Sequence, residues 1–128
     1  MLNRSGISKT SYTNPNQILA NVFMQSSVGC IVPQDAGVEV NDKKIAKAGT
    51  PICVDLMNRN NAANVAAEGS PMNAVLLHDV DVTAGNANGT ALIFGFVNVS
   101  RLDTDVVEKV NAAKAITGAT TLITFMKA

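Results

Sequence analysis

Residues 74–102 read AVLLHDVDVTAGNANGTALIFGFVNVSRL, and this stretch decides the fold. It opens with the apolar run Val75-Leu76-Leu77, after which polar and apolar residues alternate as far as Thr83. Successive side chains of a β-strand point to opposite faces of the sheet. The alternation therefore predicts one strand, continuous to Thr83, with a buried face and a solvent-exposed face.

A turn and a second strand follow in the same stretch. Residues 84–89 are small and contain two glycines, which supply the positive φ angles of a turn. In residues 90–99 both alternating sets of side chains are apolar. Such a strand is typical of a sheet that lies between two layers, so the stretch predicts the centre of a small β-rich domain.

Two segments of this stretch carry a resemblance to a known family. The segments LLHDVDVTAGN (residues 76–86) and ALIFGFVN (residues 91–98) resemble the core of the head decoration proteins of tailed bacteriophages. That family includes the head-fibre proteins and, more distantly, the lambdoid capsid decoration protein. The segment AGTP (residues 48–51) matches a further family element, and the resemblance extends over residues 46–128. The family more often has a glycine where Asn73 and Ala74 stand here.

The resemblance implies a function. A member of this family would be a non-enzymatic structural protein that binds the outer surface of the assembled phage head and stabilises it. Its partner would be the major capsid protein, its oligomer would be a homotrimer, and it would need no cofactor. It would be made in the host cytoplasm and end in the virion. The alternative is a binding module of the phage tail or baseplate, or a host-surface binder, with the same β-rich fold.

The predicted fold class is mainly β (α+β): a small β-sandwich or β-barrel-like domain with one C-terminal helix before the last strand. Apolar residues at helical spacing predict that helix over residues 102–117, with Asp103 or Thr104 as N-cap and Gly118 at its end. Short apolar or alternating runs predict the other strands, at residues 27–33, 38–40, 51–56 and 120–126, the last of them inside the sheet. Residues 58–70, rich in Asn and Ala, predict an exposed loop with at most marginal helix.

Residues 1–16 are predicted to form an extended N-terminal arm, and residues 17–128 a single β-rich domain. The segment is polar and ends in Asn14-Pro15-Asn16, where the proline disfavours helix at Asn14. Such a segment is either a frayed tail or an arm that orders on a partner by strand addition. In lambdoid relatives the arm meets the capsid, so the resemblance implies capsid contacts here. Arg4, Lys9 and Tyr12 have the side chains best able to anchor such an arm.

Composition excludes several function classes. Ten basic and ten acidic residues give a net charge of zero, without the basic patch that nucleic-acid binding requires. The chain has no Trp, and no apolar run long enough to cross a membrane. Met1–Ser5 does not begin an apolar signal-peptide run, so we expect synthesis in a reducing cytosol and no membrane partner.

Few residues could carry chemistry. His78 falls on the opposite face of the predicted strand from Asp79 and Asp81, whose spacing could suit a divalent cation. We prefer a structural role in which both carboxylates accept hydrogen bonds from backbone N–H groups of the adjoining turn. A small enzyme using His78 with Asp79 or Asp81 is the least favoured interpretation. We expect Cys30 and Cys53 to be two buried free thiols. With none of these residues favoured for chemistry, the sequence predicts no catalytic, cofactor or metal residues.

Overall fold

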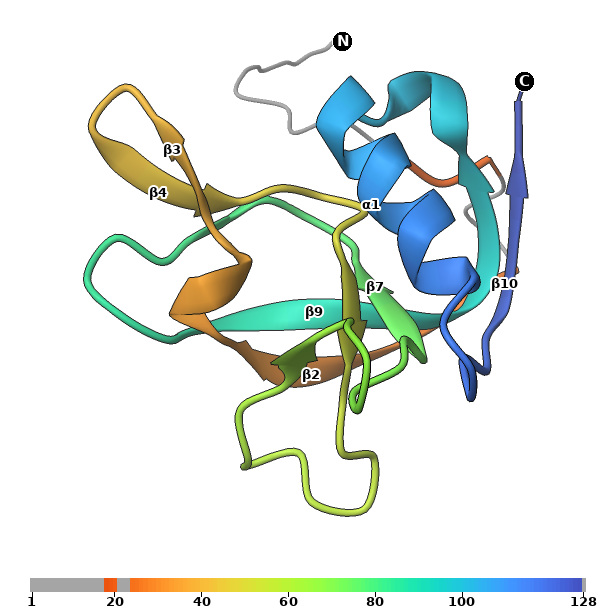
Figure 1. The fold of residues 1–128 in the computed structure, drawn as a ribbon, viewed down its shortest axis with the longest axis horizontal. Helices are drawn as coiled ribbons and strands as arrows, with labels where there is room; N and C mark the ends of the chain where they lie inside the picture. The colour runs from red at the N-terminus through yellow and green to blue at the C-terminus, as the bar shows by residue number, and fades with distance from the viewer. Residues whose placement is uncertain (1–17, 21–23, 128) are drawn as a thin grey trace, which may run out of the picture.

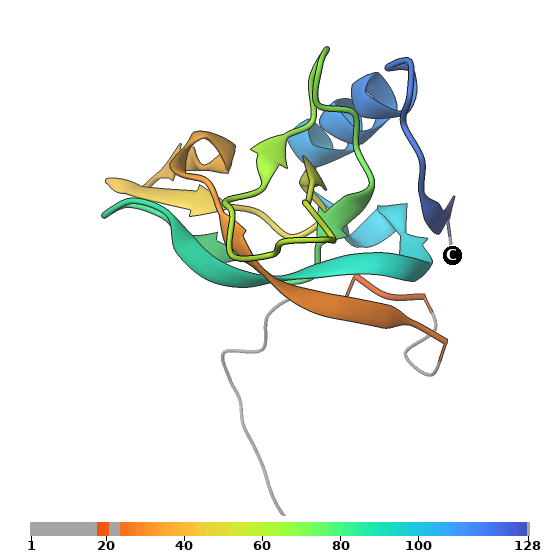
Figure 2. The same ribbon diagram turned by 90° about the horizontal axis from the view of Figure 1, so that it is seen from below.

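Strand β9 (Ala87–Asn98) is the longest strand and runs through the centre of the molecule (Figure 1). The computed structural model describes residues 18–20 and 24–127. Strand β2 (Ser26–Val32) lies antiparallel along β9, as Figure 2 shows from below. β9 also pairs with β7 (Ala74–Leu76), which is antiparallel, and with β10 (Leu122–Met126), which is parallel to it.

The remaining elements form the rest of two sheets. The larger sheet has the order β10-β9-β7-β5-β6, with β2 attached to β9, and includes β5 (Pro51–Cys53) and β6 (Asn64–Val65). The smaller sheet contains β3 (Val38–Val40), β4 (Lys43–Ala46) and β8 (Val80–Asp81). The helices are α1 (Thr104–Lys114) and the short 3₁₀ turns η2 (Gln34–Ala36) and η3 (Val99–Arg101). The predicted fold class, mainly β with one helix before the last strand, is confirmed.

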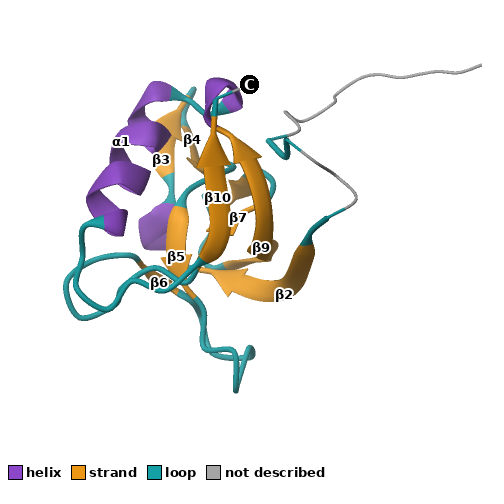
Figure 3. Ribbon diagram, turned by 90° about the vertical axis from the view of Figure 1, so that its right-hand side faces the viewer, coloured by secondary structure: helices purple, strands orange, loops and turns teal. Residues whose placement is uncertain are grey.

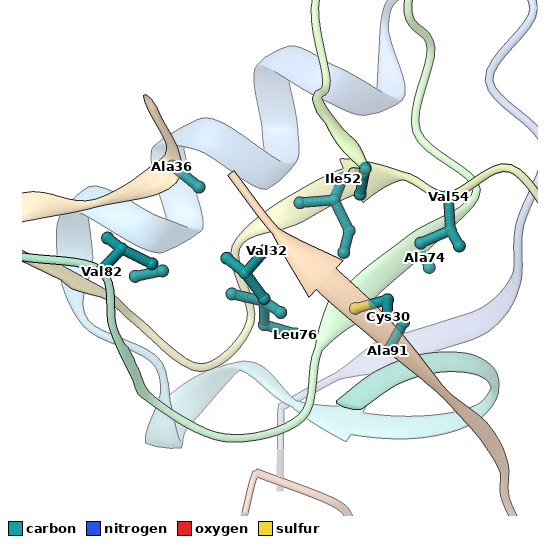
Figure 4. Close-up of a cluster of buried hydrophobic side chains, with 11 residues drawn as sticks. Cys30, Val32, Ala36, Ile52, Val54, Ala74, Leu76, Val82 and Ala91 are labelled. Atoms are coloured by element: carbon teal, nitrogen blue, oxygen red, sulfur yellow. The ribbon is translucent and has the colours of Figure 1, made fainter. Parts of the chain in front are cut away.

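Apolar side chains pack on both faces of the larger sheet. Ala91 belongs to one buried cluster and its neighbour Leu92 to the other, and Leu76 and Val75 divide in the same way. Figure 4 shows the first cluster, to which β2, β5, β7 and β9 all contribute. The prediction that β9 lies between two apolar layers is therefore confirmed.

The predicted strand over residues 75–83 is two strands, so that prediction is wrong in its continuity. β7 belongs to the larger sheet and β8 to the smaller one. Between them the chain crosses from one sheet to the other, since Leu77 N–H donates to Thr90 O whereas Val82 N–H donates to Lys44 O. The alternation itself holds, with Val82 buried and Asp81 exposed.

The predicted turn over residues 84–89 is shorter, because β9 already begins at Ala87. Residues 87–89 pair with residues 30–32 of β2. Gly89 serves close packing and not the turn, because a Cβ there would come within 2.6 Å of Val32 Cγ2. Asn41 and Asp42 form the turn between β3 and β4, and both residues have positive φ angles.

Helix α1 lies inside the predicted range 102–117 and buries the expected face, with Val106, Val110 and Ala113 inaccessible to solvent. Asp103 stands at the N-cap, although its side chain makes no capping hydrogen bond. Strand β10 lies at the edge of the sheet, so its predicted interior position is wrong. The reason is the parallel β9-α1-β10 crossover, which returns the chain beside β9 after every other strand has been placed.

Residues 58–70 form the predicted exposed loop, but the marginal helix is absent. In its place stand the two-residue strand β6 and a bridge between Ala67 and Ser70. Strand β5 ends at Cys53, earlier than predicted, because the Asp55 carboxylate accepts the N–H groups of Met57 and Asn58 and turns the chain.

Candidate interaction surface

The predicted contact residues Arg4, Lys9 and Tyr12 lie outside the described residues, as does the whole of residues 1–16. The structure does describe the point where this segment joins the domain. Ile18 and Leu19 are 1% and 4% exposed. Ala20 N–H donates to Phe96 O at 2.8 Å, and Asn98 N–H donates to Ile18 O at 2.7 Å. Ile18–Ala20 therefore pair with the C-terminal half of β9.

Four large apolar side chains are exposed near this end of β9, and we name them the edge patch. Its members are Met24, Phe94, Leu122 and Met126, with exposed fractions of 51%, 37%, 72% and 43%. Leu122 of β10 pairs with Phe94 of β9, so their side chains emerge on the same face of the sheet. Met24 borders the same strand, since its carbonyl oxygen lies 3.4 Å from the position of a Cβ at Gly95.

The edge patch continues into a groove of about 760 Å³, which residues from β2, β9 and the segment before β10 line. Phe94, Ile93 and Leu122 form much of its wall, and Leu56 closes it on the far side. Next to Leu56, Met57 is 95% exposed on the loop that Asp55 organises. Exposed apolar side chains that gather around a groove are typical of a docking surface for another macromolecule.

Two other hollows are less suited to docking. One of about 530 Å³, on the other side of Leu56, is lined largely by polar residues and backbone, including Asn58, Arg59 and Asn88. A smaller one of about 240 Å³ lies between α1 and β5, with Asp35 and Lys109 among its lining residues.

His78, Asp79 and Asp81 lie at the surface, and the two carboxylates bind backbone N–H groups. All three are exposed, and the Asp79 carboxylate accepts the Ala48 N–H at 2.7 Å. The Asp81 carboxylate accepts the Thr83 N–H at 2.9 Å, and hydrogen bonds from the Thr83 side chain and backbone lower the pKa of Asp81. The preferred structural role, in which both carboxylates accept backbone N–H groups of the adjoining turn, is confirmed for Asp81 only. Asp79 instead accepts the N–H of Ala48, which precedes β5 and lies 31 residues away in sequence.

Cys30 and Cys53 are both free thiols, as predicted, although only Cys30 is fully buried. Burial raises the pKa of Cys30, and burial together with the charge of Asp55 raises that of Cys53. A raised pKa leaves little thiolate at neutral pH and disfavours both as nucleophiles. Among residues 18–20 and 24–127, no three His, Cys, Asp or Glu side chains gather where they could hold a metal ion.

Comparison with known proteins adds no relative. No protein-family model matches the chain, and no curated protein matches it. In the described part of the chain, no helix is long and apolar enough to span a membrane.

Sequence reasoning missed the edge patch. The prediction that residues 90–99 lie between two layers implied a buried Phe94, whereas this ring is exposed at the mouth of the groove. A signal was available in β10, where Leu122, Thr124 and Met126 alternate with Ile123 and Phe125. Two largely apolar faces predicted an interior strand, but they equally suit an edge strand with a partner on one face.

Proposed function

We propose that this chain is a bacteriophage capsid decoration protein, which binds the outside of the assembled head and stabilises it. Two sequence segments in and around β7, β8 and β9 support the proposal through their resemblance to the decoration and head-fibre family. The mainly β fold with a helix before the last strand is compatible with it.

The observation that carries the proposal is the arrangement around the C-terminal half of β9. Ile18–Ala20 bind one edge of this half, and β10 with its exposed Leu122 binds the other. Ile18–Ala20, which follow the proposed arm, and the groove beside Phe94 therefore both adjoin the C-terminal half of β9. One shell subunit could contact the arm while the apolar face of the β domain covers its neighbour.

The mechanism is the sum of the surface that many bound copies bury against the shell. Each copy bridges subunits of the major capsid protein, and many copies on a symmetric lattice increase the stress that the shell tolerates. Arg4, Lys9 and Tyr12 are the proposed arm contacts. The protein acts without catalysis, cofactor, nucleic acid or membrane, forms a homotrimer on the shell, and belongs to the virion after synthesis in the host cytoplasm.

The alternative function is a binding module of the phage tail, baseplate or host surface. The exposed Met57 and Leu56 on their loop favour it as the second candidate, because a protruding apolar loop also suits a tail component or a cell-wall polymer. The two functions differ in the partner that retains the protein, not in the fold.

Co-sedimentation with undecorated heads of the phage that encodes the chain tests the proposal. We expect saturable binding of the full chain and its loss on deletion of residues 1–16. Alanine at Arg4, Lys9 or Tyr12 should weaken binding, whereas Asn111→Ala, on the exposed face of α1, should not.

The outcomes separate the two candidates. Equal binding with and without residues 1–16 would retain decoration and move the contact to the β domain. Absence of binding by either form would contradict decoration of that head, and binding to purified tails or host envelopes would then support the alternative.

A further inference from the structure

Strand β10 forms an open edge of the larger sheet. Its only strand partner among the described residues is β9, and Figure 3 shows the two side by side. In Figure 1, β10 stands at the right-hand margin, with no labelled element beyond it. The side of β10 that faces away from β9 has no strand partner among the described residues, although the Ile123 N–H donates to Thr121 Oγ1 at 3.0 Å. Such an edge can pair with another strand.

This edge lacks the features that usually prevent pairing. Natural edge strands carry charges, prolines or bulges that block a second strand. Residues 115–126 contain neither a charged residue nor a proline, and the β9–β10 register runs without interruption from Leu122 to Met126. The first charge after Lys114 is Lys127. The edge is therefore built to receive an uncharged strand.

The sequence of β10 is complementary to itself in the antiparallel direction. If Thr124 stands opposite its own copy, Leu122 faces Met126 of the second copy, and Ile123 faces Phe125. The exposed apolar pair then meets on one face of the sheet, and the buried Ile123 meets the half-buried Phe125 on the other. Such cross-strand apolar pairs stabilise a sheet.

Charge also suits this register. Lys127 comes opposite Thr121 of the second copy, so the two Lys127 ammonium groups lie apart, at opposite ends of the joint. Phe125 already carries Lys114 at 5.3 Å from its ring centre, on the half-buried face and away from the joint between Leu122 and Met126. No like charges oppose one another along the paired segment.

We propose that a second copy of this chain binds the β10 edge by antiparallel pairing of β10 with β10, about a two-fold axis at Thr124. The larger sheets of the two copies then form one continuous sheet. The face with Leu122 and Phe94 stays open and is doubled in extent. A two-fold contact is saturated by one partner, so a trimer would use a different surface. The pairing does not depend on the proposed capsid function.

Charge substitution at Thr124 tests the pairing without shells. Thr124 is exposed, so neither Thr124→Lys nor Thr124→Glu should alter folding, which circular dichroism and thermal unfolding would verify. In equilibrium sedimentation we expect the wild type to reach twice its 13.3 kDa mass. Each variant alone should dimerise at least about tenfold more weakly, because identical charges meet on the axis. An equimolar mixture of the two variants should dimerise again.

Matched controls make the test specific to the axis. Asn111→Lys and Asn111→Glu, on the exposed face of α1, should dimerise as the wild type does. Under oxidising conditions Thr124→Cys should form a disulfide-linked dimer, whereas Leu122→Cys, on the same face but opposite Met126, should not. A wild type that stays monomeric at all concentrations would overturn the proposal, as would oligomers that Thr124→Lys leaves unchanged.

Discussion

At the scale of single residues, polar side chains complete hydrogen bonds that the short strands leave open. The Asn73 amide accepts the Val54 N–H and donates to the Val54 carbonyl, both at 2.9 Å, and so acts as a strand neighbour beyond the end of β5. The Asp79 carboxylate accepts the Ala48 N–H, and the Asp81 carboxylate accepts the Thr83 N–H. Both carboxylates therefore stabilise the backbone of the fold.

Gly49 combines a positive φ angle with close packing, and both disfavour a side chain at this position. Its φ is +92°, and a Cβ would stand 2.5 Å from Leu102 Cδ2 and 3.1 Å from Val106 Cγ1. We expect Gly49→Ala to lower the free energy of unfolding by roughly 2–4 kcal/mol, from backbone strain plus overpacking under α1. Urea unfolding would measure it.

Gly69→Ala is the matched control. Gly69 has nearly the same φ, +91°, but nothing lies within 4 Å of its Cβ position. Gly69→Ala should therefore lower the free energy of unfolding by about 1–2 kcal/mol, from backbone strain alone. If both variants lost the same stability, the proposed contact between Gly49 and α1 would contribute nothing.

At the scale of elements, α1 lies in the chain between β9 and the edge strand β10, and it also contacts the segment that joins β4 to β5. Its buried face packs on the larger sheet, and Lys47, just after β4, reaches the start of the helix. The Lys47 ammonium lies 2.9 Å from the Asp103 carboxylate and 3.4 Å from that of Asp105. The pair holds the helix N-terminus against the turn that leads into β5.

Removing the contact between Lys47 and the two aspartates should lower the free energy of unfolding slightly, by an amount that depends on pH. The hydrogen bond and charge of Asp103, with those of Asp105, raise the pKa of Lys47 above its ordinary value of 10.5. The stabilisation is therefore complete below that value and disappears as the pH rises through the raised one. At pH 7, Lys47→Met should cost up to about 1 kcal/mol, since both carboxylates are about half exposed and solvent screens them.

Urea unfolding of wild type and Lys47→Met between pH 7 and 12 checks this expectation. The difference in stability should narrow at the alkaline end. A difference that stays constant would mean that the Lys47 stem contributes through packing and not through charge.

At the scale of the whole molecule, different parts of the chain cover the two apolar clusters. The first is closed by β2 and the smaller sheet, and the second by α1, β10 and residues 18–19. Ile18 and Leu19 are the first described residues, and both are buried in the second cluster. The domain therefore depends on residues that directly follow the predicted arm.

Two truncations test the predicted boundary between residues 16 and 17. Removal of residues 1–16 should leave thermal and urea unfolding nearly unchanged. Removal of residues 1–20 takes away two buried side chains and two backbone hydrogen bonds to β9, and should cost roughly 3–6 kcal/mol. Equal loss in both truncations would place the boundary earlier than Asn16. The shorter deletion also supplies the folded control for the sedimentation experiment.

The periodicity of the sequence determined most of the elements by itself. The apolar run in residues 27–33, alternation in residues 38–40, helical spacing from Val106 to Ala113, and two apolar faces after Thr90 each correspond to a local geometry, and the structure contains all of them. These patterns succeed because the burial of a side chain within one element follows from the pitch of that element. The role of Asp81 was also predictable, since its carboxylate accepts the N–H group two residues further on, whereas the partner of Asp79 is distant in sequence.

Only the tertiary structure decided how the elements pair. The stretch from Ala74 to Asp81 is divided between two sheets, β10 is an edge strand, and Phe94 with Leu122 is exposed. None of these follows from local pattern, because an apolar strand looks the same whether a second layer, a second strand or a partner molecule covers it. Pairing depends on contacts between residues distant in sequence, such as Ile18 with Asn98 and Leu122 with Phe94. The candidate surface consists of such contacts, so its position could emerge only from the folded chain.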